Sequence, residues 1–115
     1  MKAIIYHNPR CSKSRLTLDL LKENEVETII VEYLKSTPGV FEFKNILKML
    51  GKTAHEVVRK GEPVYKELGL DKKDLSEMEL IKIMVKNPKL IERPIVVVDQ
   101  KAVIGRPPEN ILEII

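Results

Sequence analysis

The sequence predicts an α/β fold, with a small mixed sheet of about four strands, flanking helices and a helical insert. At the N-terminus a strand, a helix and a second strand follow one another, which favours parallel pairing through a right-handed crossover. Helical segments then fill the middle of the chain, and two short strands around a tight turn come last. Because 115 residues is the length of one ordinary domain, we expect a single domain over residues 1–115 with a helical insert at about 36–90.

The N-terminal segment supplies the first strand, helix and strand. Lys2–Tyr6 is an apolar run of strand length. Ser12–Asn24 has leucines at positions 16, 18, 20 and 21 with polar residues between them, which is typical of a helix. Thr28–Tyr33 is rich in β-branched residues and predicts the second strand.

The insert reads as helical. Ser36–Gly51 opens with Ser-Thr-Pro, ends at glycine and carries apolar residues at helical spacing. Thr53–Lys60 predicts a short helix, and Leu75–Lys86 predicts a longer one behind an Asp or Ser cap. We interpret Tyr65–Leu70 as packing and turn.

The C-terminal segment predicts a hairpin and a last helix. Pro94–Val98 and Lys101–Gly105 are the two strands, joined by Asp99-Gln100 as the turn. After the Pro107-Pro108 pair, a helix is expected over Glu109–Ile115.

Composition limits the classes of function. The chain has one cysteine and two histidines, which excludes an internal disulfide framework, argues against a zinc–thiolate site and indicates a reducing, cytoplasmic compartment. No apolar run is long enough to span a membrane, and the first six residues are too short for a signal peptide. The net charge of +3 is spread along the chain without interleaved aromatics, so we expect a small anionic substrate and no nucleic acid.

The single cysteine lies in the segment YHNPRCSKSR at residues 6–15, where the first strand has ended and the first helix begins. Unpaired backbone N–H groups and the positive end of the helix dipole stabilise a thiolate there, and flanking cations add to this. Ser14 lies one turn on, and His7 could add charge or a hydrogen bond. We therefore expect Cys11 to be a nucleophile, with a buried structural cysteine as the alternative.

Two familiar cysteine motifs are absent. A phosphatase-type loop needs arginine six residues after the cysteine, but Thr17 is at that position and Arg15 is only four residues on. A dithiol redox motif needs a second cysteine three residues on, and Ser14 is there instead. Any disulfide formed by Cys11 must therefore join it to another molecule.

Two arginines are predicted to meet across the hairpin. If Asp99-Gln100 is a two-residue turn, Arg93 faces Arg106, and two opposed cations repel each other unless an anion lies between them. The planar guanidinium is suited to binding a tetrahedral oxyanion through two bonds. The alternative is that each arginine pairs with a nearby acid, such as Glu92 or Glu109.

With these residues in place, the chain resembles the arsenate reductase (ArsC) family of the glutaredoxin-linked, thioredoxin-like type. The matching segments are YHNPRCSKSR at 6–15, VVRKGEPVYKELGL at 57–70, NPKLIERPIVV at 87–97 and IGRPPE at 104–109. The resemblance implies a thioredoxin-like fold with Cys11 as nucleophile and His7 and Ser14 as support for the thiolate. It also implies Arg59, Arg93 and Arg106 as the oxyanion-binding residues and Pro94 as a cis-proline beside the thiol.

The function implied by this resemblance is reduction of arsenate to arsenite. Glutathione would be the co-substrate, glutaredoxin the protein partner, and we expect a monomer with no bound cofactor and no metal. One alternative is a glutathione-dependent thiol oxidoreductase acting on another substrate. Another is a non-catalytic adaptor of the same fold that binds RNA polymerase, although such adaptors often use a paired-cysteine switch that Ser14 rules out.

Overall fold

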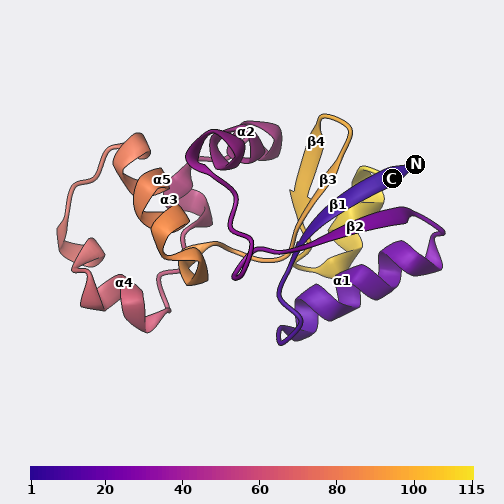
Figure 1. The fold of residues 1–115 in the computed structure, drawn as a ribbon, viewed down its shortest axis with the longest axis horizontal. Coiled ribbons are helices and arrows are strands. Elements are labelled where there is room, and N and C mark those ends of the chain that lie inside the picture. The colour runs from indigo at the N-terminus through magenta and orange to yellow at the C-terminus, as the bar shows by residue number, and fades with distance from the viewer. The chain divides into compact units, whose positions relative to one another are not determined.

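A four-stranded mixed sheet organises the N- and C-terminal parts of the chain in the computed structural model, which describes all 115 residues. Its strands are β1 (Lys2–His7), β2 (Glu27–Glu32), β3 (Ile95–Val98) and β4 (Lys101–Ile104), in the order β2-β1-β3-β4 (Figure 1). β1 pairs parallel with β2 and antiparallel with β3, and β3 pairs antiparallel with β4. This is the mixed α/β sheet that the sequence predicts.

The chain divides into two compact units. The sheet unit comprises Met1–Ser36 and Arg93–Ile115, and the helical unit comprises Thr37–Glu92. No helix in either unit combines the length and the apolar character needed to cross a membrane.

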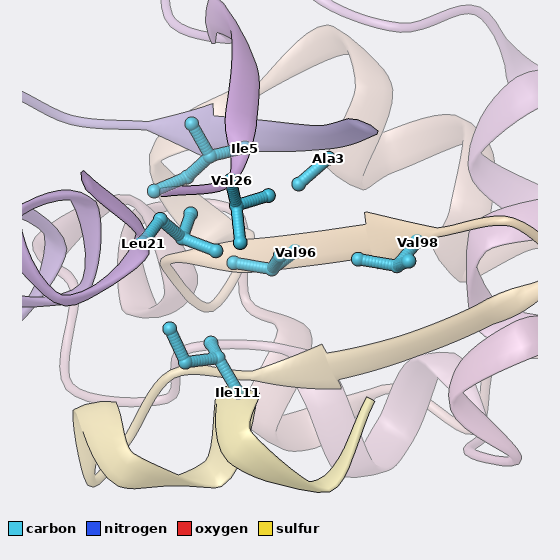
Figure 2. Packing of buried hydrophobic residues seen from close by; sticks show 7 residues of the cluster. All are labelled: Ala3, Ile5, Leu21, Val26, Val96, Val98 and Ile111. Carbon is cyan, nitrogen blue, oxygen red and sulfur yellow. The ribbon is translucent and has the colours of Figure 1, made fainter. Parts of the chain in front are cut away.

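In the sheet unit, helix α1 (Ser12–Glu23) and the 3₁₀ helix η3 (Pro108–Glu113) pack against each other and enclose a core with the sheet. Figure 2 shows the side chains that converge there from β1, β3, these two helices and the connection between α1 and β2: Ala3, Ile5, Leu21, Val26, Val96, Val98 and Ile111. Burial of each larger side chain of this set contributes about 1.5–3 kcal/mol to folding. This core holds α1 and η3 against the sheet.

In the helical unit, α5 (Glu77–Lys86) packs against α2 (Val40–Leu50) and α3 (Ala54–Val57). Ser76 begins α5 with a capping box, because its hydroxyl accepts from the Glu79 N–H at 3.2 Å while the Glu79 carboxylate accepts from the Ser76 N–H at 3.1 Å. The helix α4 (Pro63–Glu67) and the 3₁₀ helices η1 (Leu70–Lys72) and η2 (Pro88–Leu90) complete the unit.

Several predicted boundaries are wrong for identifiable reasons. α2 begins at Val40 rather than Ser36, because Pro38 disfavours helix in the residue before it and Gly39 is extended. α3 ends at Val57 rather than Lys60, because Val58 is extended and bridges to Ile91. The segment expected to be only packing and turn, Tyr65–Leu70, contains the end of α4 and the start of η1.

The last helix also differs from the prediction. A helix was expected over Glu109–Ile115, and the structure has the tighter 3₁₀ helix η3 at Pro108–Glu113. Pro107 precedes it in extended conformation and Pro108 occupies the first helical position, where the missing N–H has no cost. The Ile111 side chain from this short helix is fully buried in the core.

Candidate active site

Cys11 lies at the junction between β1 and α1. The loop after β1 turns back so that the Cys11 N–H donates to the Asn8 carbonyl at 3.0 Å. Cys11 is the N-cap residue of α1, with an extended backbone (φ −95°, ψ 123°), and its carbonyl accepts from the Arg15 N–H at 3.0 Å. The half-buried thiol therefore lies at the helix end where backbone N–H groups lack helical partners.

The surroundings of Cys11 favour its charged form. Burial raises the pKa of the thiol, but hydrogen bonds from the Ser14 N–H, the Arg93 guanidinium and the Lys13 N–H oppose this, together with the Arg93 charge. The net result is a Cys11 pKa below its ordinary value. A thiolate held in this way is a nucleophile at lower pH than a free cysteine.

The hairpin brings both C-terminal arginines to this thiol. Val98 pairs with Lys101, as the predicted two-residue turn requires, and the ladder ends with Ile95 opposite Ile104. One step further, the Gly105 N–H donates to the Pro94 carbonyl at 2.9 Å. The next residues beyond this pair are therefore the two arginines, Arg93 before β3 and Arg106 after β4.

Arg106 contacts both the cysteine and the opposing strand. Its Nη1 donates to Cys11 Sγ at 3.7 Å and to the Arg93 carbonyl at 3.4 Å. Since Arg93 also hydrogen-bonds the thiol, two guanidinium groups and one sulfur meet at this edge of the sheet unit. Guanidinium N–H groups beside a nucleophile can hold a tetrahedral oxyanion for attack.

Two peptide bonds next to these arginines are cis. The Arg93–Pro94 bond has the geometry that the resemblance implies for Pro94, and the Arg106–Pro107 bond is cis as well. Both prolines thus directly follow an arginine of the site.

A close contact that the sequence did not indicate joins the hairpin to α1. The fully buried Thr17 hydroxyl lies 2.8 Å from the Lys13 carbonyl and 3.2 Å from the Gly105 carbonyl. A Cβ atom at Gly105 would lie 2.5 Å from Thr17 Oγ1 and 2.9 Å from Pro94 Cγ, so only glycine fits. Glycine directly before Arg106 at a strand end is a sign of close backbone approach, whereas nothing in the sequence distinguishes Thr17.

His7 and Ser14 are buried together beneath the cysteine loop. His7 Nδ1 and Ser14 Oγ share a hydrogen bond of 2.7 Å, and the Asn8 N–H donates to the same hydroxyl at 3.1 Å. Burial is the main cause that lowers the pKa of His7, so its ring is neutral near pH 7. The Ser14 hydroxyl is thus engaged with the loop, while its backbone N–H supports the thiolate.

The remaining predicted site residue, Arg59, belongs to the helical unit. Its N–H donates to the Leu90 carbonyl at 2.7 Å, which holds the backbone after α3. Its guanidinium pairs with two carboxylates, Glu92 at 2.8 Å and Glu62 at 3.5 Å. Glu92, which the sequence offered as a partner for one of the hairpin arginines, is therefore a partner of Arg59.

The sheet unit thus contains all the other predicted site residues, namely His7, Cys11, Ser14, Arg93, Pro94 and Arg106. Among histidine, cysteine and acidic side chains, no group of three or more is arranged to hold a metal ion.

Comparison with known proteins places the chain in a family. The model of the ArsC family matches residues 6–114. The chain is 57% identical to the uncharacterized protein YfgD of Escherichia coli K12, over 96% of this chain and 94% of that protein. It is 48% identical to an arsenate reductase of Haemophilus influenzae over the full length of both chains. The structure of an arsenate reductase from Vibrio cholerae superimposes with a TM-score of 0.96 at 46% identity, covering 100% of this chain and 98% of that one. The chain therefore belongs to the ArsC family and has its thioredoxin-like fold.

Proposed function

We propose that this protein is an arsenate reductase in which Cys11 is the nucleophile. The observation that carries the proposal is the meeting of a thiol of lowered pKa with two arginines at the start of α1. Relatives across the full length of the chain are named arsenate reductase, which supports arsenate as the oxyanion.

In the first step, Arg93 and Arg106 bind arsenate through its oxygens and place arsenic next to the sulfur. The Cys11 thiolate attacks arsenic, a sulfur–arsenic bond forms, and one arsenate oxygen leaves as water after taking up protons from solvent. The two guanidinium groups offset the negative charge of both reactants, which otherwise repel each other. The resemblance assigns Arg59 to the same oxyanion, and this assignment remains a prediction because Arg59 belongs to the helical unit.

The second step needs a thiol from outside the chain, because Cys11 is the only cysteine. The glutathione thiolate attacks Cys11 Sγ of the adduct, a sulfur–sulfur bond forms, and the sulfur–arsenic bond breaks with its electron pair going to arsenic, which changes from As(V) to As(III). Arsenite leaves, and the two sulfurs remain joined as a mixed disulfide on Cys11. Glutaredoxin then reduces this disulfide and restores the thiolate.

We propose that the protein is a monomer and that the reaction takes place in the cytoplasm. A lone thiolate of low pKa persists only where small thiols keep it reduced. No bound cofactor is required, because the electrons come from glutathione.

The test is arsenite release by the purified protein with arsenate, glutathione and glutaredoxin, omitting each component in turn. The proposal requires turnover only with the full set. After a single turnover without glutaredoxin, intact-mass spectrometry should show one glutathione on Cys11. Turnover without any external thiol would contradict the mechanism.

A second candidate is a thiol oxidoreductase that acts on a different substrate. The lowered pKa of Cys11 favours it equally, because thiol–disulfide exchange needs a thiolate and no oxyanion. Failure to release arsenite, together with efficient disulfide exchange at Cys11, would support this candidate.

A further inference from the structure

A second concave surface lies beside the cysteine loop, and the reaction with arsenate leaves it unused. It is a cavity of about 490 Å³ bounded by His7 and Pro9 on one side and by α1 on the other. The helix contributes Leu18 together with Ser12, Arg15, Leu16 and Asp19, and the spacing of i, i+3, i+4 and i+7 places the last four on one face of α1. We refer to this surface as the α1 groove.

The groove carries both signs of charge within one turn of the helix. Arg15 Nη1 donates to the Pro9 carbonyl at 3.1 Å, which orients the guanidinium and leaves its other N–H donors for a ligand. Asp19 lines the same groove but makes no hydrogen bond or ion pair within the chain, not even with Arg15. Leu16 lies between them in sequence and is 51% exposed.

This combination suits the free end of an amino acid. A carboxylate matches the Arg15 guanidinium and an ammonium group matches the Asp19 carboxylate, as in the zwitterion that every α-amino acid group forms near pH 7. A simple anion would use Arg15 but would be repelled by Asp19. The groove therefore favours a zwitterion over an oxyanion, in contrast to the site formed by Arg93 and Arg106.

The groove also lies next to the nucleophile along the chain. Ser12 directly follows Cys11, and the Arg15 N–H donates to the Cys11 carbonyl at 3.0 Å. Glutathione has a free amino-acid group at its γ-glutamyl end and a thiol one residue further on, a span of about 7 Å for two extended residues. A ligand that places its amino-acid end in the groove can direct its sulfur toward the N-terminal end of α1, where Cys11 lies.

We propose that the α1 groove binds the amino-acid end of the thiol co-substrate through Arg15 and Asp19. This inference rests on the proposed function, because that function requires an external thiol. It names the part of that thiol which the protein recognises.

The experiment uses an exchange reaction that needs no arsenate. The Cys11 thiolate attacks one sulfur of oxidised glutathione, a Cys11–glutathione disulfide forms, and the sulfur–sulfur bond of the reagent breaks to release one glutathione thiolate. The rate is followed by intact mass and divided by the rate with 2-hydroxyethyl disulfide, which lacks the zwitterion. This ratio removes changes in the reactivity of Cys11 itself.

Asp19→Asn and Arg15→Gln should each lower the ratio about fivefold, the size expected for one charge contact at an exposed site. Glu23→Gln and Lys22→Gln, which change exposed charges on α1 outside the groove, should leave it unchanged. With the disulfide of N-acetylglutathione, which lacks the ammonium group, Asp19→Asn should no longer lower the ratio.

The arsenite-release assay tests the proposed function separately from this site. If Asp19→Asn and Arg15→Gln keep the wild-type ratio, the groove is not the recognition site, whatever the result with arsenate. If wild-type Cys11 shows no preference for oxidised glutathione over 2-hydroxyethyl disulfide, the inference is likewise overturned.

Discussion

In the sheet unit two arginines are arranged around a thiol, whereas in the helical unit one arginine is arranged between two carboxylates. Arg106 Nη1 lies 3.7 Å from Cys11 Sγ, and Arg93 helps to lower the pKa of that thiol. Arg59 pairs with Glu92 at 2.8 Å and with Glu62 at 3.5 Å. The comparison shows that an arginine already paired with carboxylates is less available to bind an anionic substrate than one beside a thiol, even where both belong to the same sequence motif set.

The largest expected effect comes from removing the group at the centre of the sheet-unit site. Cys11→Ser replaces the thiolate by a hydroxyl that stays protonated, so arsenite release should fall by at least about 10³-fold. Because serine has nearly the same shape, the midpoint of urea unfolding should stay close to that of the wild type at a pH below the folded-state pKa of Cys11, where the thiol is protonated. Residual turnover within tenfold of the wild type would show that another group starts the reaction.

The next prediction concerns the two hairpin arginines. Lysine keeps the charge of Arg93 or Arg106 but loses the planar fork, so kcat/KM for arsenate should fall about tenfold to a hundredfold in either variant. Sulfate or phosphate should also protect wild-type Cys11 from alkylation by occupying the same place. Fully active lysine variants would mean that charge alone is needed.

The contact between Gly105 and Thr17 is expected to have a smaller effect, on stability. Gly105→Ala places a Cβ atom within 2.5 Å of Thr17 Oγ1, and the free energy of unfolding should fall by about 2 kcal/mol. Urea denaturation gives the value. Adding Thr17→Ala removes one side of the overlap, so the double variant should lose less than the sum of the single variants. Strict additivity would show that the two positions are independent.

Much of the sheet-unit site could be predicted because local rules agree there. The position of Cys11 between a strand and a helix follows from apolar periodicity and chain order. The approach of Arg93 and Arg106 follows from a two-residue turn, because the register of a hairpin is fixed once its turn is known. Both inferences depend on residues that are near each other in the sequence or related by simple pairing.

The parts that could not be predicted depend on packing between distant segments. The spacing of the leucines predicted the helix α1 but not its buried positions, which are Ser14, Thr17 and Leu21, while Leu16 is 51% exposed. Polar side chains can line this face because Ser14 bonds to His7 and Thr17 lies against the Gly105 carbonyl. These partners belong to other elements of the fold, so the pattern of apolar residues within α1 does not reveal them.

The carboxylate partners of Arg59 could not be predicted from the sequence either. Glu92 directly precedes Arg93, and its closeness in sequence suggested a pair. The bridge between Val58 and Ile91 brings Glu92 to Arg59, which is 33 residues away in the sequence. Sequence distance is therefore a poor guide to ion pairs outside helices.

A smaller effect than that of Gly105→Ala is expected in the helical unit, where the positive charge of Arg59 is already offset by two carboxylates. The pairs are about three-quarters buried, and Arg59→Gln should lower the free energy of unfolding by about 1 kcal/mol. Its effect on the KM for arsenate should be smaller than that of Arg93→Gln or Arg106→Gln. An equal or larger effect on KM would place Arg59 among the main oxyanion-binding residues, and the contrast between the two units would fail.

The smallest expected effect is the pH dependence of stability that Cys11 introduces. Folding lowers the pKa of this thiol, so the folded protein binds the proton less tightly than the unfolded chain does. The resulting stabilisation is complete above the unfolded-state pKa of about 8.5 and is lost as the pH falls through the lower folded-state pKa. The difference in unfolding free energy between the wild type and Cys11→Ser should therefore grow in favour of the wild type as the pH rises across this window. Thiolate absorbance near 240 nm gives the folded-state pKa independently, and Arg93→Gln should raise it. A difference that stays flat across the window would mean that Cys11 is not preferentially ionised by the fold, and the reactivity assigned to it would lose its electrostatic basis.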